Sequence, residues 1–544
     1  MFLCFSFLNL TVISKIISSP VSQIIGRMSL KDKKLCSRID VYTYAFVAIL
    51  GLALFLRFHE LGQPYFWQTE IHHTWPAKNF LEGQGFSKPA GSHVPYLRSW
   101  FTTTVPIAIS FTLLGYNEFA ARLPTLIVGL FTIIVSYLLG KDIGGKKLGL
   151  TTSSIMAVSF WVINWHTQAR MYAHNQFLYI LSIWLVLRWY ERDKLALKSN
   201  YLYSLVPTVL LGFHNHMTYL AMGPVIGVYF SLMLISKLDY TKWRSQIKQD
   251  ELVRRNILWL IAFLFCGSIF MLVRGEGILV WLVDYAPAWY IWDRGPLYYL
   301  NYLSDNLIIL YMFGFGLALS IRYRNNWLIP VSFLIPFVFQ SLLRFKEPRL
   351  IFHLYPLYAL IAAIPAVYVF NIIEDGLKSL NIDYQKINLA IVLLICLFVF
   401  SIYTPFQSLQ QKDEAPHGFV VGSNHRAPAN YIQDRMTEDD IIISSAPSIT
   451  GWYLGSMDYV DYDLNYIEHR NESGHLIDPN TEIKAVKNSD RMEEIISNNT
   501  GWIVADSNFY TDFKIKKDVR QTIIQNSRKI ENDSWENTDI YRFE

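Results

Sequence analysis

The sequence has little charge and very little cysteine. Only 17% of its 544 residues are charged and 52% are hydrophobic, whereas a soluble globular chain carries about 25% charged residues. The four cysteines match no zinc-ligand spacing, and none lies in the last quarter of the chain. These shortages exclude an ordinary soluble fold and a disulfide framework in the C-terminal region. The net charge of +4 is too small to predict a nucleic-acid partner.

Motifs for nucleotide-driven and hydrolytic chemistry are also absent. The sequence has no P-loop, no glycine-rich dinucleotide fingerprint and no nucleophile elbow. Metal binding is disfavoured as well, because the adjacent His72 and His73 point apart on a helix. No cysteine or aspartate stands at ligand spacing from these two histidines or from His93. We therefore expect no metal and no other cofactor.

Long hydrophobic runs dominate what is present. With their flanks, eleven of them reach the roughly 17–25 residues that a helix needs to cross a bilayer. Backbone polar groups cannot go unpaired in lipid, so each span must be a helix. The fold class predicted is an α-helical polytopic membrane protein with about eleven transmembrane helices. The spans lie at about 41–57, 122–140, 148–165, 173–190, 201–213, 219–236, 257–273, 305–321, 327–343, 354–373 and 387–405.

The basic residues sort to one side of this arrangement. Lysine and arginine gather before the first span and after the second, fourth, sixth and eighth. The positive-inside rule makes that side cytoplasmic, which predicts a cell-membrane protein with a cytoplasmic N-terminus and an extracellular C-terminal domain. Trp100–Gly115 is apolar, but counting it as a span would place the basic loops on inconsistent sides. We therefore interpret it as an interfacial helix within one long external loop, 58–121.

Residues 1–40 are expected to form a cytoplasmic N-terminal segment. Phe2–Ile17 is an apolar run of signal-peptide length, but it lacks a basic leading region and an obvious cleavage site. A translation start at Met28 and a genuine extra interfacial helix are equally open.

The transmembrane domain is expected to occupy 41–406, and the pattern changes from 407 to 544. There, short buried strands alternate with amphipathic helices, which is typical of a small α/β domain with a parallel-type sheet. The helices are expected at Ala429–Met436, Asp490–Ser497 and Lys517–Arg528, and the strands at Asp440–Ser445, Gly501–Asp506 and Asp539–Phe543.

Several external loops carry residues suited to chemistry on a lipid-borne substrate. Glu70 lies just beyond the first span, where partial loss of hydration suits a general base, although position alone favours a solvated interfacial glutamate. Arg170 and Arg349 lie in two other external loops. Each can snorkel to the head groups or bind a lipid phosphate, and Arg344 and Lys346 beside Arg349 favour the phosphate.

Six short segments of the sequence match segments of a known protein family and occur in the same order as in that family. They are Leu56–Gly62, Trp67–Glu70, His93–Tyr96, Gly115–Pro124, the segment from Gln168 through Arg170 and Tyr172, and Arg349 with Tyr355-Pro356. Together they resemble the GT-C superfamily, in the branch of protein O-mannosyltransferases and lipid A aminoarabinose transferases. The resemblance covers about 41–406.

This resemblance implies a mechanism. Such enzymes bind a polyprenyl- or dolichyl-phosphate sugar at the outer leaflet, and an acceptor hydroxyl on a protein or glycolipid attacks the anomeric carbon. A first-loop carboxylate takes the proton and basic residues hold the departing phosphate. The resemblance implies Glu70 as the proton acceptor. It also implies a set of residues that bind the donor phosphate or substrate: Arg170, Tyr172, Arg349, Lys346, His93 and Gln168.

Two departures from the family pattern leave a second function open. Thr69 and Gln168 are neutral where the family is acidic. Either Glu70 serves as the base of an active transferase of mannose or another hexose, or the enzyme works slowly, or the chain is an inactive relative. An inactive relative would act as a lipid-linked sugar binder, flippase or assembly partner. Few polar residues lie in the predicted spans, which disfavours a transporter.

Overall fold

The computed structural model describes residues 40–544, apart from 88–95, 266–294, 403–422, 462–468 and shorter stretches of one to four residues. The predictions made for the N-terminal segment, for His93 and for the second half of the seventh span therefore lie outside the described residues.

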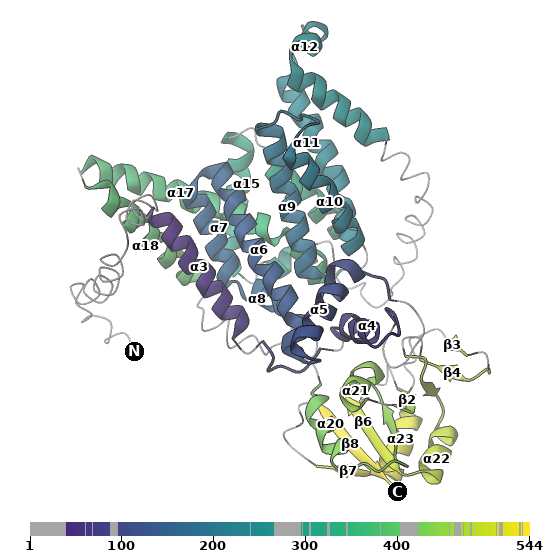
Figure 1. The fold of residues 1–544 in the computed structure, drawn as a ribbon. Helices are drawn as coiled ribbons and strands as arrows, with labels where there is room; N and C mark the ends of the chain where they lie inside the picture. The colour runs from purple at the N-terminus through teal and green to yellow at the C-terminus, as the bar shows by residue number, and fades with distance from the viewer. Residues whose placement is uncertain are drawn as a thin grey trace, which may run out of the picture.

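A helical bundle forms most of the molecule (Figure 1). A helix stands at each of the eleven positions predicted for a span, although the seventh is described only over 251–265. Within the described chain, five helices are long and apolar enough to cross a membrane, or six with one bent pair. These helices support a multi-pass membrane protein, and the number of eleven transmembrane helices stays a prediction. The helices are α3 (Val41–Phe58), α6 (Glu118–Gly144), α7 (Lys146–Val158), α8 (Phe160–His166), α9 (Tyr172–Glu191), α10 (Asn200–Asn215), α11 (Met222–Lys237), α15 (Leu307–Tyr323), α16 (Leu328–Leu342), α17 (Tyr355–Ser379) and α18 (Tyr384–Ile402), with the shorter α12 (Trp243–Gln249) and α14 (Tyr298–Leu303).

The third predicted span is bent rather than straight. The axes of α7 and α8 differ by 67°, and the break falls at Ser159, whose ψ of 120° is extended. The last carbonyl groups of a helix have no partner within it. Here the buried Arg57 supplies one, because its guanidinium donates to the carbonyl oxygens of Met156 and Ala157 at 3.0 and 2.9 Å.

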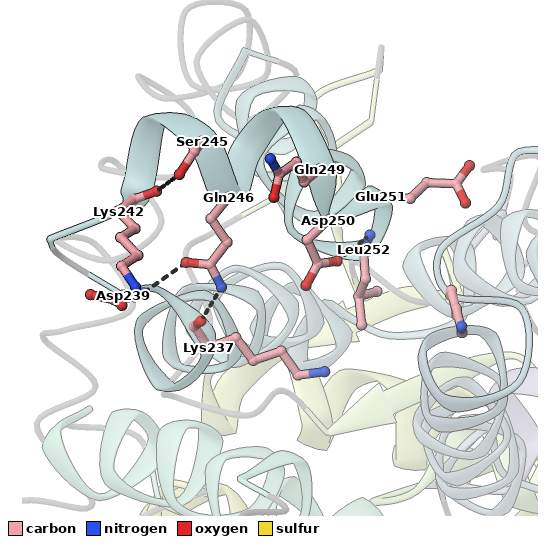
Figure 2. A pocket seen from close by; sticks show the side chains of 10 residues that line it. Lys237, Asp239, Lys242, Ser245, Gln246, Gln249, Asp250, Glu251 and Leu252 are labelled. Carbon is pink, nitrogen blue, oxygen red and sulfur yellow. Dashed lines mark hydrogen bonds between the residues drawn. The ribbon is translucent and has the colours of Figure 1, made fainter.

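One end of the bundle collects the basic loops. Lys146 forms an ion pair with Asp40 at the start of α3, Lys147 with Glu374 near the end of α17, and Arg188 with Asp142. A surface pocket of about 710 Å³ lies at this end, where α11 leads into α12 (Figures 1 and 2). Its lining is charged and polar and includes Lys194, Lys237, Lys242, Asp239, Asp250 and Glu251.

The long loop between α3 and α6 lies at the opposite end of the bundle, between it and the C-terminal domain (Figure 1). It contains α4 (Ile71–Leu81), a π-helical turn η1 (Trp100–Thr104) and α5 (Val105–Leu114). The predicted helix Trp100–Gly115 coincides with η1 and α5. Because α5 packs on both α4 and α6, this apolar run covers the end of the bundle.

The C-terminal domain is built on an eight-stranded sheet of order β3-β4-β5-β2-β1-β6-β8-β7. The prediction of a parallel-type sheet was wrong for its edges. β1, β2, β5 and β6 pair in parallel, whereas β8 returns antiparallel to β6, and β3, β4 and β7 are also antiparallel. The strands are β1 (Ile441–Ser444), β2 (Tyr459–Asp461), β3 (His469–Arg470), β4 (Leu476–Ile477), β5 (Lys484–Val486), β6 (Gly501–Asp506), β7 (Arg528–Ile530) and β8 (Thr538–Phe543).

Helices cover both faces of this sheet. Ile503 of the fully buried β6 points to the face covered by α22 (Ser489–Asn498) and α23 (Lys517–Asn526). Its neighbours Trp502 and Val504 point to the face covered by α20 (Arg426–Gln433) and α21 (Pro447–Leu454). This alternation is what a strand buried on both faces requires. It leaves α20 and α21 on the side that faces the helical bundle.

Candidate active site

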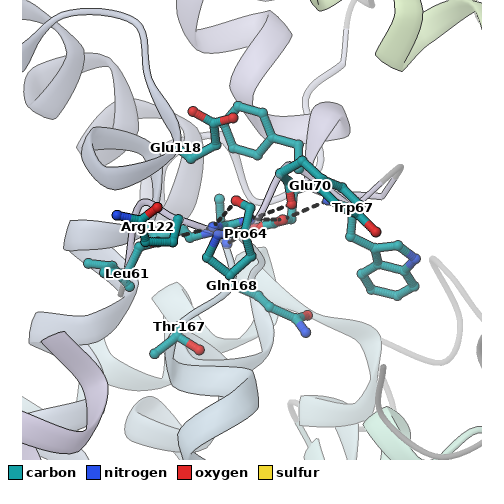
Figure 3. A network of polar contacts seen from close by, with 12 residues as sticks. Leu61, Pro64, Trp67, Glu70, Glu118, Arg122, Thr167 and Gln168 are labelled. Atoms are coloured by element: carbon teal, nitrogen blue, oxygen red, sulfur yellow. Dashed lines mark hydrogen bonds and ion pairs between the residues drawn. The ribbon is translucent and has the colours of Figure 1, made fainter. Parts of the chain in front are cut away.

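A buried ion pair connects the loop between α3 and α6 to the helical bundle (Figure 3). Arg122 of α6 donates from Nε to Oε1 of Glu70 at 2.9 Å and from Nη2 to Oε2 at 2.8 Å. The two residues are 4% and 1% exposed. Such two-bond contacts between arginine and carboxylate fix orientation as well as charge.

The remaining hydrogen-bonding capacity of both partners is also used. The amides of Trp67 and Ala169 donate to the two Glu70 oxygens at 2.9 and 2.7 Å. Arg122 donates further to three carbonyl oxygens of the loop, those of Leu61, Pro64 and Tyr65. Glu70 therefore accepts four hydrogen bonds, which corrects the picture of a partly hydrated carboxylate. To accept a proton it must first lose one of these donors.

Unpaired polar atoms gather beside this ion pair. Arg170 donates from Nη1 to the carbonyl oxygen of Thr69, and Gln168 donates to Asn164 at 2.7 Å. Within the described part of the chain, Thr69 Oγ1, Gln168 Oε1 and Arg170 Nε are buried without a hydrogen-bond partner. Leaving such atoms unpaired costs about 1–3 kcal/mol each. Their gathering at the end of the bundle marks a place for a polar ligand.

His216, which begins the turn after α10, adds a hydrogen-bond donor. Its Nδ1 lies 2.9 Å from the hydroxyl of Thr218 and accepts from the amide of Thr218 at 3.2 Å. With Nδ1 as the acceptor, the neutral ring carries its proton on Nε2. That atom is buried and has no hydrogen-bond partner in the described residues. Burial, with smaller contributions from nearby arginines, lowers the pKa of His216 well below its usual range. The ring is therefore a neutral donor at pH 7. It packs against Tyr172, with 5.5 Å between ring centroids.

Arginines from three loops share the surroundings of His216. Arg98, Arg170 and Arg349 all lie near enough to act on its charge, and Arg170 also lies over the Tyr172 ring at 5.6 Å. The structure therefore brings together Arg170, Tyr172 and Arg349, which the sequence placed in separate loops. Gln168 lies two residues from Arg170 in the same turn.

Lys346 bonds to its own loop, and His93 lies outside the described chain. Lys346 donates to the carbonyl oxygen of Leu343 at 2.6 Å, at the end of α16, and partial burial lowers its pKa. His73 contacts Thr104 through Nδ1 at 3.2 Å and Met171 through Nε2 at 3.3 Å. Among the described residues, no three histidine, cysteine, aspartate or glutamate side chains could share a metal ion. Metal-independent chemistry stays a prediction.

Three residues of this site were missed by sequence reasoning. Arg122 stands in the Gly115–Pro124 string, and its charge beside the second span was the available signal. Arg98 lies in the loop between α3 and α6 and is exposed. His216 sits at the junction of two apolar helices, where a lone histidine gives no pattern, and only its fold neighbours reveal its role.

Residues 94–264 match the family model described as dolichyl-phosphate-mannose-protein mannosyltransferase. An uncharacterised protein of Aquifex aeolicus is 26% identical over 385 residues, covering 67% of this chain and 70% of its own. The region 94–264 that matches the family model includes Arg122, Gln168, Arg170 and His216.

Solved structures show the same fold at low identity. ArnT from Cupriavidus metallidurans bound to undecaprenyl phosphate has a TM-score of 0.59 at 14% identity, covering 91% of this chain and 97% of that one. The archaeal oligosaccharyltransferase AglB from Archaeoglobus fulgidus, in complex with an inhibitory peptide and a dolichol-phosphate, has a TM-score of 0.56 at 12% identity. That match covers 92% of this chain and 74% of AglB. The chain therefore has the GT-C fold that the sequence strings resemble.

Proposed function

We propose that this protein transfers a sugar, mannose or another hexose, from a polyprenyl- or dolichyl-phosphate donor to a hydroxyl group. The acceptor hydroxyl belongs to a protein or glycolipid at the outer face of the membrane. One observation carries the proposal: the buried His216 packs on Tyr172, which also contacts Arg170, and Arg98 and Arg349 lie within electrostatic range of the same histidine at one end of a GT-C bundle. Three arginines and a neutral N–H donor suit a phosphate group that gains charge as its sugar leaves.

Each group has a distinct role in this proposal. The arginine side chains offer planar pairs of donors to the phosphate oxygens. His216 adds an N–H whose position is held by the Thr218 amide. Tyr172 contacts both the Arg170 guanidinium and the His216 ring and helps to hold the two groups in place. The relatives support such a donor, because ArnT was solved with undecaprenyl phosphate and AglB with a dolichol-phosphate.

Glu70 takes one of two roles. As the proton acceptor, it would need the Trp67 or Ala169 amide, or Arg122, to move away during the reaction. As a positioning residue, it would keep all four hydrogen bonds and hold Thr69 and Arg170 in place through the loop. The observed geometry favours the second role, and the substitutions argued in the Discussion separate the two.

The orientation in the membrane belongs to the same proposal. The basic loops and the pocket of Figure 2 lie at one end of the bundle, and the C-terminal domain lies at the other (Figure 1). With the positive-inside rule this supports a cytoplasmic N-terminus and an extracellular C-terminal domain. The proposed transfer site then opens at the outer leaflet.

A second candidate function is a non-catalytic relative that binds lipid-linked sugar, flips it or assists assembly. It is favoured by the neutral Thr69 and Gln168 together with the fully bonded Glu70, since none of them is a free carboxylate at this site.

One experiment tests both candidates. The full chain is reconstituted in lipid with radiolabelled polyprenyl-phosphate hexoses and a membrane extract as acceptor, and donor binding is measured separately. Label moving to a protein or glycolipid supports the transferase. Saturable donor binding without transfer supports the non-catalytic relative. Absence of both binding and transfer overturns the proposal.

A further inference from the structure

Tyr453 of α21 connects the C-terminal domain to the loop that carries Glu70. Its hydroxyl accepts a hydrogen bond from the amide of Phe66 at 2.9 Å and donates to Oε1 of Glu118 at 2.8 Å. Phe66 lies four residues before Glu70. The hydroxyl is thus held by the loop on one side and by α6 on the other.

Arg426, at the start of α20, makes a second connection to the same two elements. It donates from Nη1 to Glu118 at 3.1 Å and from Nη2 to the carbonyl oxygen of Gln63 at 2.6 Å. Glu118 is 8% exposed and accepts from both Arg426 and Tyr453. Through these bonds, Tyr453 and Arg426 both connect the C-terminal domain to the loop and to the first turn of α6.

Aromatic side chains also pack between the C-terminal domain and the loop. Trp452 lies edge-on to Phe66 and to Trp75, each with 5.4 Å between ring centroids. The indole N–H of Trp75 donates to the carbonyl oxygen of Ser448 at 2.8 Å. Phe66 is fully buried, although it belongs to a surface loop. It belongs to one buried cluster with residues of its own loop and with Ala446 and Ile449 of the C-terminal domain.

The two ends of this connection meet on α6. Glu118 and Arg122 are four residues apart, one helical turn, so they lie on the same face. Glu118 binds the C-terminal domain, and Arg122 binds Glu70 and the carbonyl groups of the loop. The C-terminal domain and the helical bundle thus both bond to the same short segment, 61–70.

We propose that the C-terminal domain is a working part of the transfer site, in which Tyr453 and Arg426 are positioning residues for the loop 61–70. This inference rests on the proposed function and adds to it a role for the second domain. The tyrosine is suited to the task, because burial and the neighbouring Glu118 carboxylate raise its pKa well above the usual range. Its hydroxyl therefore stays protonated and keeps donating to Glu118.

The test uses Tyr453→Phe in the full reconstituted chain. This substitution keeps the ring packing and removes only the hydroxyl. Hydrogen exchange of the peptide covering 61–70 measures how firmly the loop is held, and donor turnover measures the effect on transfer. Loss of a hydrogen bond to a carboxylate predicts faster exchange at Phe66 and a kcat lower by about tenfold, with donor KM little changed. Tyr431→Phe is the matched control, because this tyrosine packs on Trp502 and Trp535 within the same domain.

Arg426→Ala gives a second route if Tyr453→Phe folds poorly, since this arginine lies at the rim and its side chain is 36% exposed. Arg426→Lys should recover part of the lost kcat by restoring the charge. Faster exchange with parental kcat overturns the positioning role, and so does unchanged exchange. If the parent chain transfers no sugar, the proposed function fails, whereas the exchange result still decides whether the C-terminal domain holds the loop.

Discussion

Glu70 and Arg122 form a two-bond ion pair that is almost completely shielded from solvent. Around it, every remaining donor and acceptor of the two groups bonds to the loop or to the turn before α9. The position of the loop that carries Glu70 therefore depends on the opposite charges of Glu70 and Arg122. Removing either partner leaves an uncompensated buried charge, which is expensive in free energy.

The first prediction concerns this pair. Arg122→Gln should destabilise the folded protein by about 3–5 kcal/mol, because the Glu70 carboxylate is then buried without its counter-charge. Thermal unfolding in detergent measures the effect. Glu82→Gln is the control, since Glu82 contacts Lys78 only at 3.9 Å and near the surface. A parental unfolding temperature for Arg122→Gln would contradict the ion pair as described.

The second prediction concerns the donor phosphate. Arg349→Ala should weaken donor binding or turnover by roughly ten- to a hundredfold, because a hydrogen bond to a charged group contributes about 1.5–3 kcal/mol. Arg170→Ala should do the same from a different loop. Arg255→Ala removes an arginine from the opposite end of the bundle and should leave donor affinity unchanged. Parental affinity and turnover in folded Arg349→Ala protein would remove this residue from the phosphate site.

The third prediction concerns pH. Burial lowers the pKa of His73 and His216 well below the usual range, and that of His425 to about 4. The unfolded chain, with histidine pKa values near about 6.5, therefore binds more protons than the folded one below that pH. Stability is full above pH 6.5 and falls with decreasing pH by about 1.4 kcal/mol per pH unit for each histidine.

His425→Asn isolates one of these contributions. It removes the titrating ring while keeping a polar contact to Thr450, which His425 meets at 3.1 Å. The loss of stability between pH 6.5 and 4.5 should then be smaller by about 1.4 kcal/mol per pH unit. Identical pH profiles for this variant and the parent would show that His425 titrates normally.

The positions of the helices could be predicted because each appears in the sequence as a long hydrophobic run. The bend at Ser159 could not be predicted, since the break depends on Arg57 reaching carbonyl groups a hundred residues away. In the C-terminal domain, the predicted strand Gly501–Asp506 coincides with β6, which is buried on both faces. Strands β2–β5 and β7 have only two or three residues each, too few for a period of two to appear.

For the site, family strings pointed to Glu70, Arg170 and Arg349 but said nothing of their partners. Whether a carboxylate is a base or a structural anchor depends on what surrounds it. For Glu70 the deciding neighbours are Arg122, Trp67 and Ala169, which come from three separate stretches of sequence. His216 illustrates the same limit, because its tautomer follows from one backbone amide.

The fourth prediction concerns orientation. In a cysteine-free background, single cysteines at Gly145 and Arg470 are probed with an impermeant thiol reagent on intact cells. Gly145 lies in the turn between α6 and α7, beside the basic end of the bundle, and Arg470 lies in β3 of the C-terminal domain. Cysteine 470 should react and cysteine 145 should react only after permeabilisation. The reverse pattern would invert the proposed topology.

The last prediction separates the two roles of Glu70. If Glu70 is the proton acceptor, Glu70→Gln should lower turnover by about 10²–10⁴-fold while donor binding is retained. If it is a positioning residue, the same substitution should lower stability and donor binding together with turnover, because the Arg122 charge loses its partner. Measuring unfolding, donor affinity and turnover on one preparation distinguishes these outcomes.

Thr69→Asp completes this test. It introduces the carboxylate of the family pattern where a buried hydroxyl has no partner in the described residues. Arg170 already bonds to the same residue and supplies a counter-charge. If Glu70 only positions the loop, the site lacks a strong proton acceptor, so Thr69→Asp should raise turnover and Thr69→Asn, of similar shape, should not. Equal turnover in both variants and the parent would contradict the expectation that transfer is limited by the lack of a carboxylate at this position.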